Sequence, residues 1–165
     1  MDSDRTPNEG ATLTWGVKQS FRAYVEGSGG VIEVGEGARR AADGEFVFAS
    51  APGAGLRLNA DGKPEGAGRF LGEVRCQAHG GMLDVFLADP GVEVGPAGAA
   101  VTVADSRTRD RRVELALLDL AAAKVGDEGE IVIPAKLSKD GWRILGDHYL
   151  PSTPLDPLRL KLRPS

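Results

Sequence analysis

Cysteine and histidine are scarce in this chain, and their scarcity excludes several classes of site. Cys76 is the single cysteine among 165 residues, so the chain has no internal disulfide and no zinc site of the multi-cysteine type. The sequence contains only two histidines and two tyrosines. It has no Walker loop, no H-E-x-x-H helix, no G-x-S-x-G elbow and no dinucleotide fingerprint. Metal-dependent hydrolases and nucleotide enzymes of these types are therefore excluded.

Long apolar runs and an excess of basic residues are also missing. No stretch approaches the roughly 18 apolar residues of a membrane span, and residues 1–10 lack the apolar region of a secretion signal, so we expect a soluble chain with no direct membrane span. The net charge of −4 argues against nucleic acid as a partner. The one basic cluster, residues 107–112, is interpreted as a solvated turn; the alternative is a site for an anionic partner.

Glycine and proline are plentiful. The 23 glycines and 10 prolines are scattered without a period, which is typical of many short strands joined by turns. The length predicts a flexible lead-in over residues 1–11 and one domain over residues 12–165. We expect a mainly β fold, an antiparallel β-sandwich-like domain with one N-terminal helix and a few short helical turns.

The predicted helix covers residues 13–25, with Thr12 as its N-cap. Leu13, Val17, Phe21 and Tyr24 follow one another at helical spacing, which predicts a shared face. The glycine-rich segment 27–30 ends the helix.

After this helix the apolar pattern changes to the period of two that strands show. Turns are predicted at residues 59–62 and 89–91, an interruption at 78–81, and a helical turn at 120–123. The predicted strands cover residues 31–34, 45–48, 56–58, 70–78, 82–87, 92–94, 99–104, 113–117, 130–137, 142–145 and 158–162.

Two sequence windows are distinctive. The first is W-G-V-K-Q-S-F-R-A-Y at residues 15–24, and the second is A-H-G-G-M-L-D at residues 78–84. A third, weaker window is Y-L-P-S-T-P-L-D-P at residues 149–157, where Ser152 stands in place of a usual glycine. In this order and spacing, the windows resemble the HtaA domain of actinobacterial heme-uptake proteins, over roughly residues 12–162.

The resemblance implies a domain that binds ferric heme b. It implies that Tyr24 is the axial iron ligand, that His79 donates a hydrogen bond to the phenolic oxygen, and that Ser20 contacts the heme edge. It also implies that an aromatic residue near the third window stacks on the porphyrin, for which Tyr149 is the candidate. Further pocket residues are expected to be Val17, Phe21, Met82 and Phe86 as apolar walls, with Arg22 or Lys18 facing the propionates.

The chemistry of the residues is compatible with this site. Phenolate is a hard anionic donor suited to ferric iron, although free tyrosine titrates only at about pH 10. Iron coordination and a hydrogen bond from His79 would both favour the anion. Without the resemblance, Tyr24 reads as a half-buried core residue and His79 as a turn residue. Cys76 reads as a core residue; an alternative is that it competes for the iron, and His148 is a candidate sixth ligand.

The expected function is capture and transfer of ferric heme, with other heme carriers, host hemoproteins or a heme importer as partners. Enzymatic activity is the less favoured expectation. The alternatives are an intracellular heme-dependent enzyme acting on peroxide or a small substrate, and a sandwich that has lost its ligand. The family is usually secreted or held at the cell envelope. This chain carries no signal or anchor, so we expect a cytoplasmic protein or an excised extracellular domain.

Overall fold

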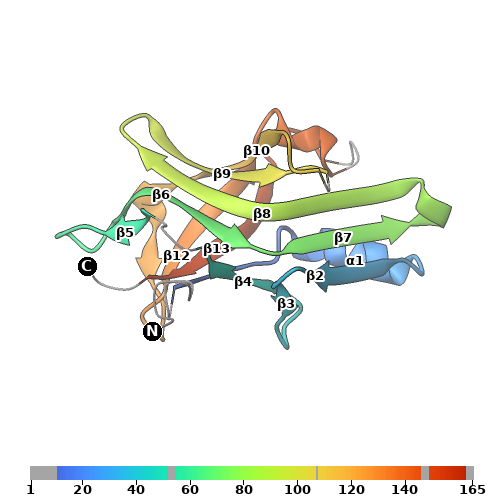
Figure 1. Cartoon of the computed structure of the whole chain (residues 1–165), viewed down its shortest axis with the longest axis horizontal. Coiled ribbons are helices and arrows are strands. Elements are labelled where there is room, and N and C mark those ends of the chain that lie inside the picture. The colour runs from blue at the N-terminus through green and yellow to red at the C-terminus, as the bar shows by residue number, and fades with distance from the viewer. Residues whose placement is uncertain (1–10, 52–54, 107, 146–148, 163–165) are drawn as a thin grey trace.

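The computed structural model describes residues 11–51, 55–106, 108–145 and 149–162 (Figure 1). The predicted lead-in lies outside the described residues, except for Ala11, which is buried. The elements in chain order are β1 (Thr12–Trp15), α1 (Gln19–Gly27), β2 (Val31–Gly35), β3 (Arg39–Arg40), β4 (Phe46–Ser50), β5 (Arg57–Leu58), β6 (Pro64–Leu71), β7 (Glu73–Ala78), η2 (His79–Gly81), β8 (Leu83–Gly95), β9 (Gly98–Ala104), β10 (Arg112–Leu118), η3 (Leu120–Ala122), β11 (Lys124–Val125), β12 (Ile131–Leu137), η4 (Gly141–Arg143) and β13 (Pro154–Lys161).

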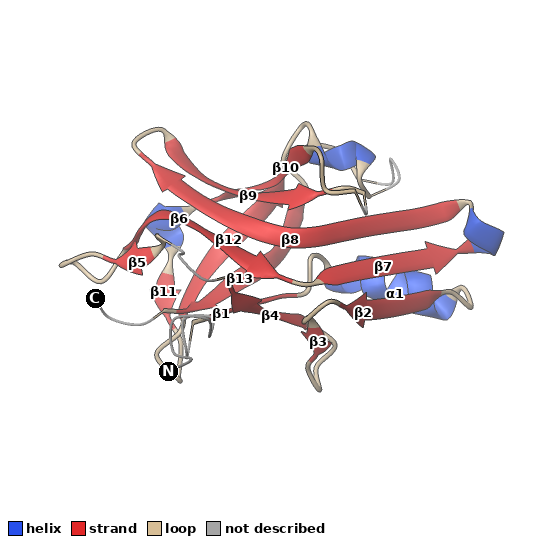
Figure 2. Ribbon diagram, viewed as in Figure 1, coloured by secondary structure: helices blue, strands red, loops and turns tan. Residues whose placement is uncertain are grey.

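The fold is mainly β and antiparallel, as the sequence predicts, with α1 as the one α-helix among the described residues (Figure 2). Eight strands follow one another around a ring in the order β8-β9-β10-β12-β13-β1-β4-β6, and pairing between β6 and β8 closes it. The strands thus form one curled, barrel-like sheet rather than two separate layers. Its interior is filled by the most deeply buried side chains, among them Leu13, Phe46, Phe70, Leu115 and Ile133. No helix in the described ranges is long and apolar enough to cross a bilayer.

Strand β8 changes partner along its length, and this change creates a sheet extension beyond the ring. Its first half pairs with β7, which pairs with β2, whereas its second half pairs with β6. The predicted turn at 89–91 is wrong: the strand passes through Asp89 and Pro90, and the register with β9 shifts between Ala88 and Gly91. Proline has no N–H for a ladder bond, so it fits this irregular position. Helix α1 packs on β2 and β7 of the extension (Figure 1).

The chain start is a strand and not the predicted first turns of a helix. Leu13 and Trp15 are buried while Thr12 and Thr14 are partly exposed, and β1 pairs with both β4 and β13. Alternation over four residues, with threonine at both partly exposed positions, favours a strand. Helix α1 begins at Gln19, so Leu13 and Val17 do not share its face.

Two other predicted elements differ in the structure. The predicted strand 70–78 is the end of β6 followed by β7, with a break at Gly72. Gly72 has a φ of +141°, and a Cβ at this position would lie 2.5 Å from the Cβ of Ala38. Only glycine fits this close approach. The predicted strand 142–145 overlaps η4 instead. The predicted strands 82–87 and 92–94 are parts of the single strand β8. The other predicted strands are confirmed within a few residues at their ends, apart from 56–58, of which β5 retains two residues, and the interruption at 78–81 is η2.

Of the three described arginines in the basic cluster of residues 107–112, two form ion pairs within the chain, and Arg112 donates hydrogen bonds to the Asp89 carbonyl and to Thr102. Arg109 forms ion pairs with Glu73 and Asp89 at 2.8 Å. Arg111 pairs with Asp105. Because these charges already have partners, the structure gives no support to the alternative of a site for an anionic partner. Arg107 lies outside the described residues.

Glu45 is a buried carboxylate directly before β4, and it makes stability depend on pH. Its Oε1 has no hydrogen-bond partner among the described residues, and the nearest cation, Arg159, is 3.8 Å away. Burial raises the pKa of Glu45 above its ordinary value of 4.5. A raised pKa means that the folded state prefers the neutral acid, so the ionised form at neutral pH reduces stability.

We therefore expect the free energy of unfolding of Glu45→Gln to exceed that of the parent by on the order of 1 kcal/mol at pH 7, so that the variant unfolds at a higher temperature. The advantage should shrink as pH falls through the raised pKa towards 4.5. Thermal unfolding between pH 4 and 8 measures it. Glu65→Gln, in an exposed pair with Arg57, is the control. A Glu45→Gln protein less stable than the parent at pH 7 would contradict this assignment.

Candidate functional site

Tyr24 and His79, 55 residues apart in sequence, meet at the outer end of the sheet extension. Tyr24 Oη lies 2.6 Å from His79 Nε2, within hydrogen-bond distance. Their rings lie 5.6 Å apart, centroid to centroid, and are tilted by 55°. Tyr24 comes from α1 and is 42% exposed, so its phenol combines a fixed partner with access from solvent. The structure thus brings together the two residues that the sequence singles out.

The backbone of η2 fixes the direction of the His79 side chain. His79 has a φ of +55°, and Gly80 and Gly81 continue with φ of +65° and +95°. A residue other than glycine in this left-handed region costs on the order of 1 kcal/mol. Pairing of Ala78 with Leu83 closes the turn from β7 to β8 and holds this conformation. The hairpin therefore maintains a strained histidine that reaches α1.

The exposed side of α1 around Tyr24 carries small side chains. Ser20 lies one turn before Tyr24, and both Ser20 and Ala23 are exposed. Met82 follows η2 and is 90% exposed. The phenol is therefore bordered by small, uncharged side chains on the helix and by the exposed Met82 thioether next to η2.

Tyr149 lies at the N-terminal end of α1. Its ring meets Phe21 edge-on at 6.2 Å between centroids, and Lys18 Nζ lies 5.6 Å from its centroid. Lys18 also donates a hydrogen bond to the Pro154 carbonyl. These contacts hold the segment before β13 against the start of the helix. His148, the predicted candidate for a sixth ligand, lies outside the described residues.

Three of the predicted pocket residues are packed inside the protein. Val17 and Phe21 are almost fully buried, and Arg22 is 6% exposed. On α1, Phe21 and Arg22 point to the covered side with Val25, away from the exposed side of Tyr24. They can shape the site from beneath; direct ligand contact by any of the three stays a prediction.

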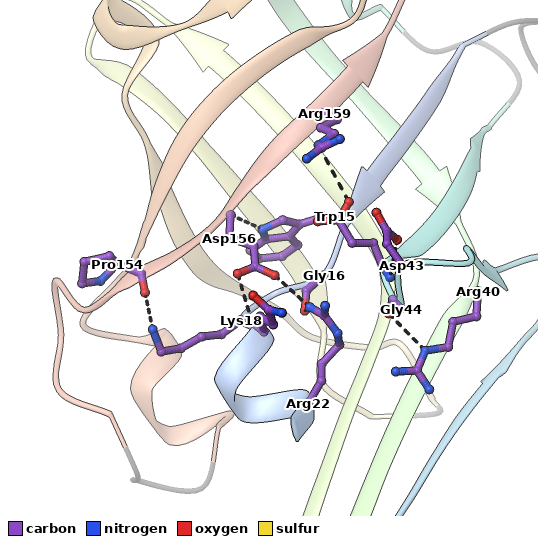
Figure 3. Close-up of polar contacts among 12 residues, drawn as sticks. Trp15, Gly16, Lys18, Arg22, Arg40, Asp43, Gly44, Pro154, Asp156 and Arg159 are labelled. Atoms are coloured by element: carbon purple, nitrogen blue, oxygen red, sulfur yellow. Dashed lines mark hydrogen bonds and ion pairs between the residues drawn. The ribbon is translucent and has the colours of Figure 1, made fainter. Parts of the chain in front are cut away.

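Asp156 on β13 contacts the start of α1, a role that the sequence analysis did not identify (Figure 3). One carboxylate oxygen accepts the backbone N–H of Gln19 at 3.0 Å, and the other accepts Arg22 Nη1 at 2.8 Å. The Asp156 carbonyl accepts Trp15 Nε1, and its N–H donates to the Val17 carbonyl. The L-D-P run at 155–157 marks the position in the sequence, but no local pattern indicates a partner 137 residues away.

Comparison with known proteins gives this site its context. The model of the family described as Htaa matches residues 10–161. The chain belongs to the HtaA family. This confirms the resemblance that the three sequence windows carry. No curated protein sequence matches the chain.

Solved HtaA-type structures have the same fold. The C-terminal domain of HtaA from Corynebacterium glutamicum aligns with a TM-score of 0.72 at 24% identity, covering 91% of this chain and 93% of that one. The N-terminal domain of the same protein gives 0.69 at 23% identity, covering 96% and 99%. Heme binding protein HtaB from C. glutamicum gives 0.65 at 20% identity, covering 91% and 90%. At these identities the likeness establishes the fold alone.

In this HtaA-family chain, Cys76 is placed poorly for binding metal. It is buried on β7, with its neighbours Val74 and Ala78 on the same covered face. Burial raises the pKa of the Cys76 thiol to about 12, so the group stays protonated at neutral pH. Since thiolate is the form that binds metals, the structure favours the interpretation of Cys76 as a core residue.

The HtaA-type fold also forms a groove far from this chemistry. A groove of about 830 Å³ lies at the hairpin between β8 and β9, with Val94, Leu117 and Pro134 among its lining residues. It contains neither Tyr24 nor His79, and its lining includes no histidine, tyrosine or cysteine. We therefore identify the candidate site by the Tyr24–His79 pair rather than by the shape of the surface.

Proposed function

We propose that this chain binds one ferric heme through Tyr24 Oη, with His79 as hydrogen-bond partner, and that it captures heme and passes it on. The observation that carries the proposal is the 2.6 Å contact between Tyr24 Oη and His79 Nε2 beside open surface. A tyrosine placed only for packing would have no need of a strained histidine as its partner. Membership of the HtaA family and the fold shared with the heme binding protein HtaB support the proposal.

The donor chemistry of the pair fits a ferric porphyrin. When bound, the ferric iron supplies the positive charge that favours phenolate over phenol. His79 can then donate its Nε2–H to the same oxygen and stabilise the negative charge. In the free protein either group can be the donor, because the imidazole tautomer decides the direction. The two residues can therefore stay hydrogen-bonded when iron replaces the proton on the phenol oxygen.

The surroundings of the pair also fit a large, flat, mostly apolar ligand. Ser20 and Ala23 add little bulk above the helix, and Met82 offers apolar surface. We assign Tyr149, held by Phe21 and Lys18, to stacking on the porphyrin. Heme b is the form that we propose, since the chain lacks the C-x-x-C-H motif of covalent attachment.

A carrier suits a tyrosinate site because the bond depends on the iron's oxidation state. An anionic oxygen ligand stabilises ferric iron more than ferrous iron, so reduction weakens the bond and favours release. We propose other heme carriers, host hemoproteins or an importer as exchange partners. The alternative of peroxide or small-substrate chemistry gains no support, because His79, the one histidine among the described residues, is already bonded to Tyr24.

Hemin titration followed by transfer to an apo-acceptor tests the proposed function. We expect absorbance to saturate at one heme per chain, where an unrelated β protein gives no saturable change. The loaded protein should lose its heme to apomyoglobin and should turn over peroxide no faster than free hemin. Absence of saturable binding would refute heme binding. Fast peroxide turnover without transfer would replace the carrier with the enzyme alternative.

A further inference from the structure

Helix α1 lacks the features by which a short helix stabilises its own N-terminus. It has nine residues, below the length at which an isolated helix is stable in water. Lys18 occupies the N-cap, but its side chain makes no hydrogen bond that caps the helix, and the first turn contains no acidic residue. Serine, threonine, asparagine or aspartate normally accepts the free N–H groups at this position. The element that presents Tyr24 therefore depends on a cap from elsewhere.

Asp156 supplies this missing cap from β13. Its carboxylate accepts the Gln19 N–H and places a negative charge at the positive end of the helix. The same residue bonds Trp15 and Val17 through its backbone, so all of its polar groups serve the junction between β1 and α1. The junction itself is strained: Val17 has a φ of +64°, rare for a β-branched residue. Asp156 thus holds both the strained segment at Val17 and the N-terminus of the helix.

Arg22 also binds Asp156 and so restricts rotation of the helix about its axis. Its Nη1 bonds Asp156 at 2.8 Å and the Gly16 carbonyl at 2.7 Å, in a largely buried pair. Arg22 precedes Tyr24 by two residues on the same short helix. The tip of a helical tyrosine lies roughly 8 Å from the axis, so a rotation of about 10° moves it by about 1.4 Å. A shift of this size directed away from His79 would lengthen the 2.6 Å contact beyond hydrogen-bond distance.

From these contacts we infer that Asp156 is a positioning residue for Tyr24, and that the site forms only when β13 is in place. Asp156 acts through Gln19 and Arg22 and does not itself reach the phenol. The inference deepens the proposed function, on which its heme readout rests. Its geometric part, the placement of Tyr24 against His79, can be tested in the metal-free protein.

Asp89 offers a matched control for Asp156. Both carboxylates are 17% exposed, both accept one backbone N–H and both bind one arginine, in the case of Asp89 the N–H of Gly72 and Arg109. Asp89 lies on β8 and has no part in the proposed site. Replacing each with asparagine removes a charge and weakens an ion pair while keeping the side-chain shape.

The experiment compares Asp156→Asn with Asp89→Asn in two measurements. The first is the imidazole nitrogen spectrum of His79 in the metal-free, ¹⁵N-labelled chain, which reports the bond to Tyr24. The second is the rate of heme loss to apomyoglobin. We expect Asp156→Asn to change the His79 signal and to speed heme loss about tenfold, and Asp89→Asn to change neither. Arg22→Gln, which leaves the carboxylate cap in place, should give a smaller shift of the same kind and serves if Asp156→Asn fails to fold.

The two measurements separate this inference from the proposed function. An altered His79 signal with unchanged heme loss would support the positioning role and refute Tyr24 as the iron ligand. An unchanged His79 signal in both Asp156→Asn and Arg22→Gln would overturn the positioning role. Equal effects of Asp156→Asn and Asp89→Asn would also overturn it, since general destabilisation would then explain both.

Discussion

Replacing Tyr24 with alanine is expected to weaken ferric heme binding by more than about a hundredfold and to change the visible spectrum of whatever heme remains bound. Loss of groups that merely support a ligand costs 10- to 100-fold, so loss of the ligand itself should cost more. Tyr24 is 42% exposed, and its removal leaves no large cavity, so the fold should persist. Absorbance titration with hemin measures both effects.

Tyr149→Phe is the matched control for this variant, because the chain contains only two tyrosines. Phenylalanine keeps the ring that meets Phe21 and lies beneath Lys18, and it removes only the hydroxyl. We expect Tyr149→Phe to keep the parent spectrum and an affinity within a few-fold of it. Equal affinities and identical spectra for the parent and Tyr24→Ala would remove Tyr24 from the site.

Replacing His79 with alanine should leave heme bound but speed its loss by 10- to 100-fold, the usual cost of losing a partner that supports a metal ligand. The phenolate would lose the donor that lies 2.6 Å from its oxygen. Its absorption bands should shift, because the charge on the oxygen is then less stabilised. Stopped-flow mixing with apomyoglobin measures the rate of loss.

His79→Asn separates the hydrogen bond from the backbone. Asparagine tolerates the positive φ of this position better than most residues, but its side chain is shorter than that of histidine. We expect His79→Asn to unfold at the parent temperature and to lose heme as fast as His79→Ala. Parental rates of loss in both variants would show that His79 has no part in holding the heme.

The sequence predicts those parts of the molecule whose pattern is local. Most strands follow from alternation and turn residues, and the A-H-G-G window marks the turn that presents His79. The prediction fails where short patterns overlap: Leu13, Val17 and Phe21 have helical spacing, yet β1 ends at Trp15 and α1 begins at Gln19. Pairing with β4 and β13 decides the conformation of this segment.

Long-range pairing is the part that the sequence leaves open. Ring closure depends on β8 exchanging β7 for β6 at Pro90, where local residues predict a turn. The burial of Arg22 depends on Asp156, 134 residues away, so a residue expected to face a ligand is instead held in an ion pair. The cap and the ion pair at the start of α1 thus come from β13, near the other end of the sequence.

Resonance Raman spectroscopy of the ferric-heme-loaded Tyr149→Phe protein, grown with ring-deuterated tyrosine, tests the central claim most directly. In this variant Tyr24 is the only tyrosine, so any tyrosinate vibration enhanced through the iron must come from it. We predict phenolate bands that shift on deuteration and disappear in the Tyr24→Ala, Tyr149→Phe double variant. A loaded protein whose iron-linked bands do not respond to tyrosine deuteration would contradict the account.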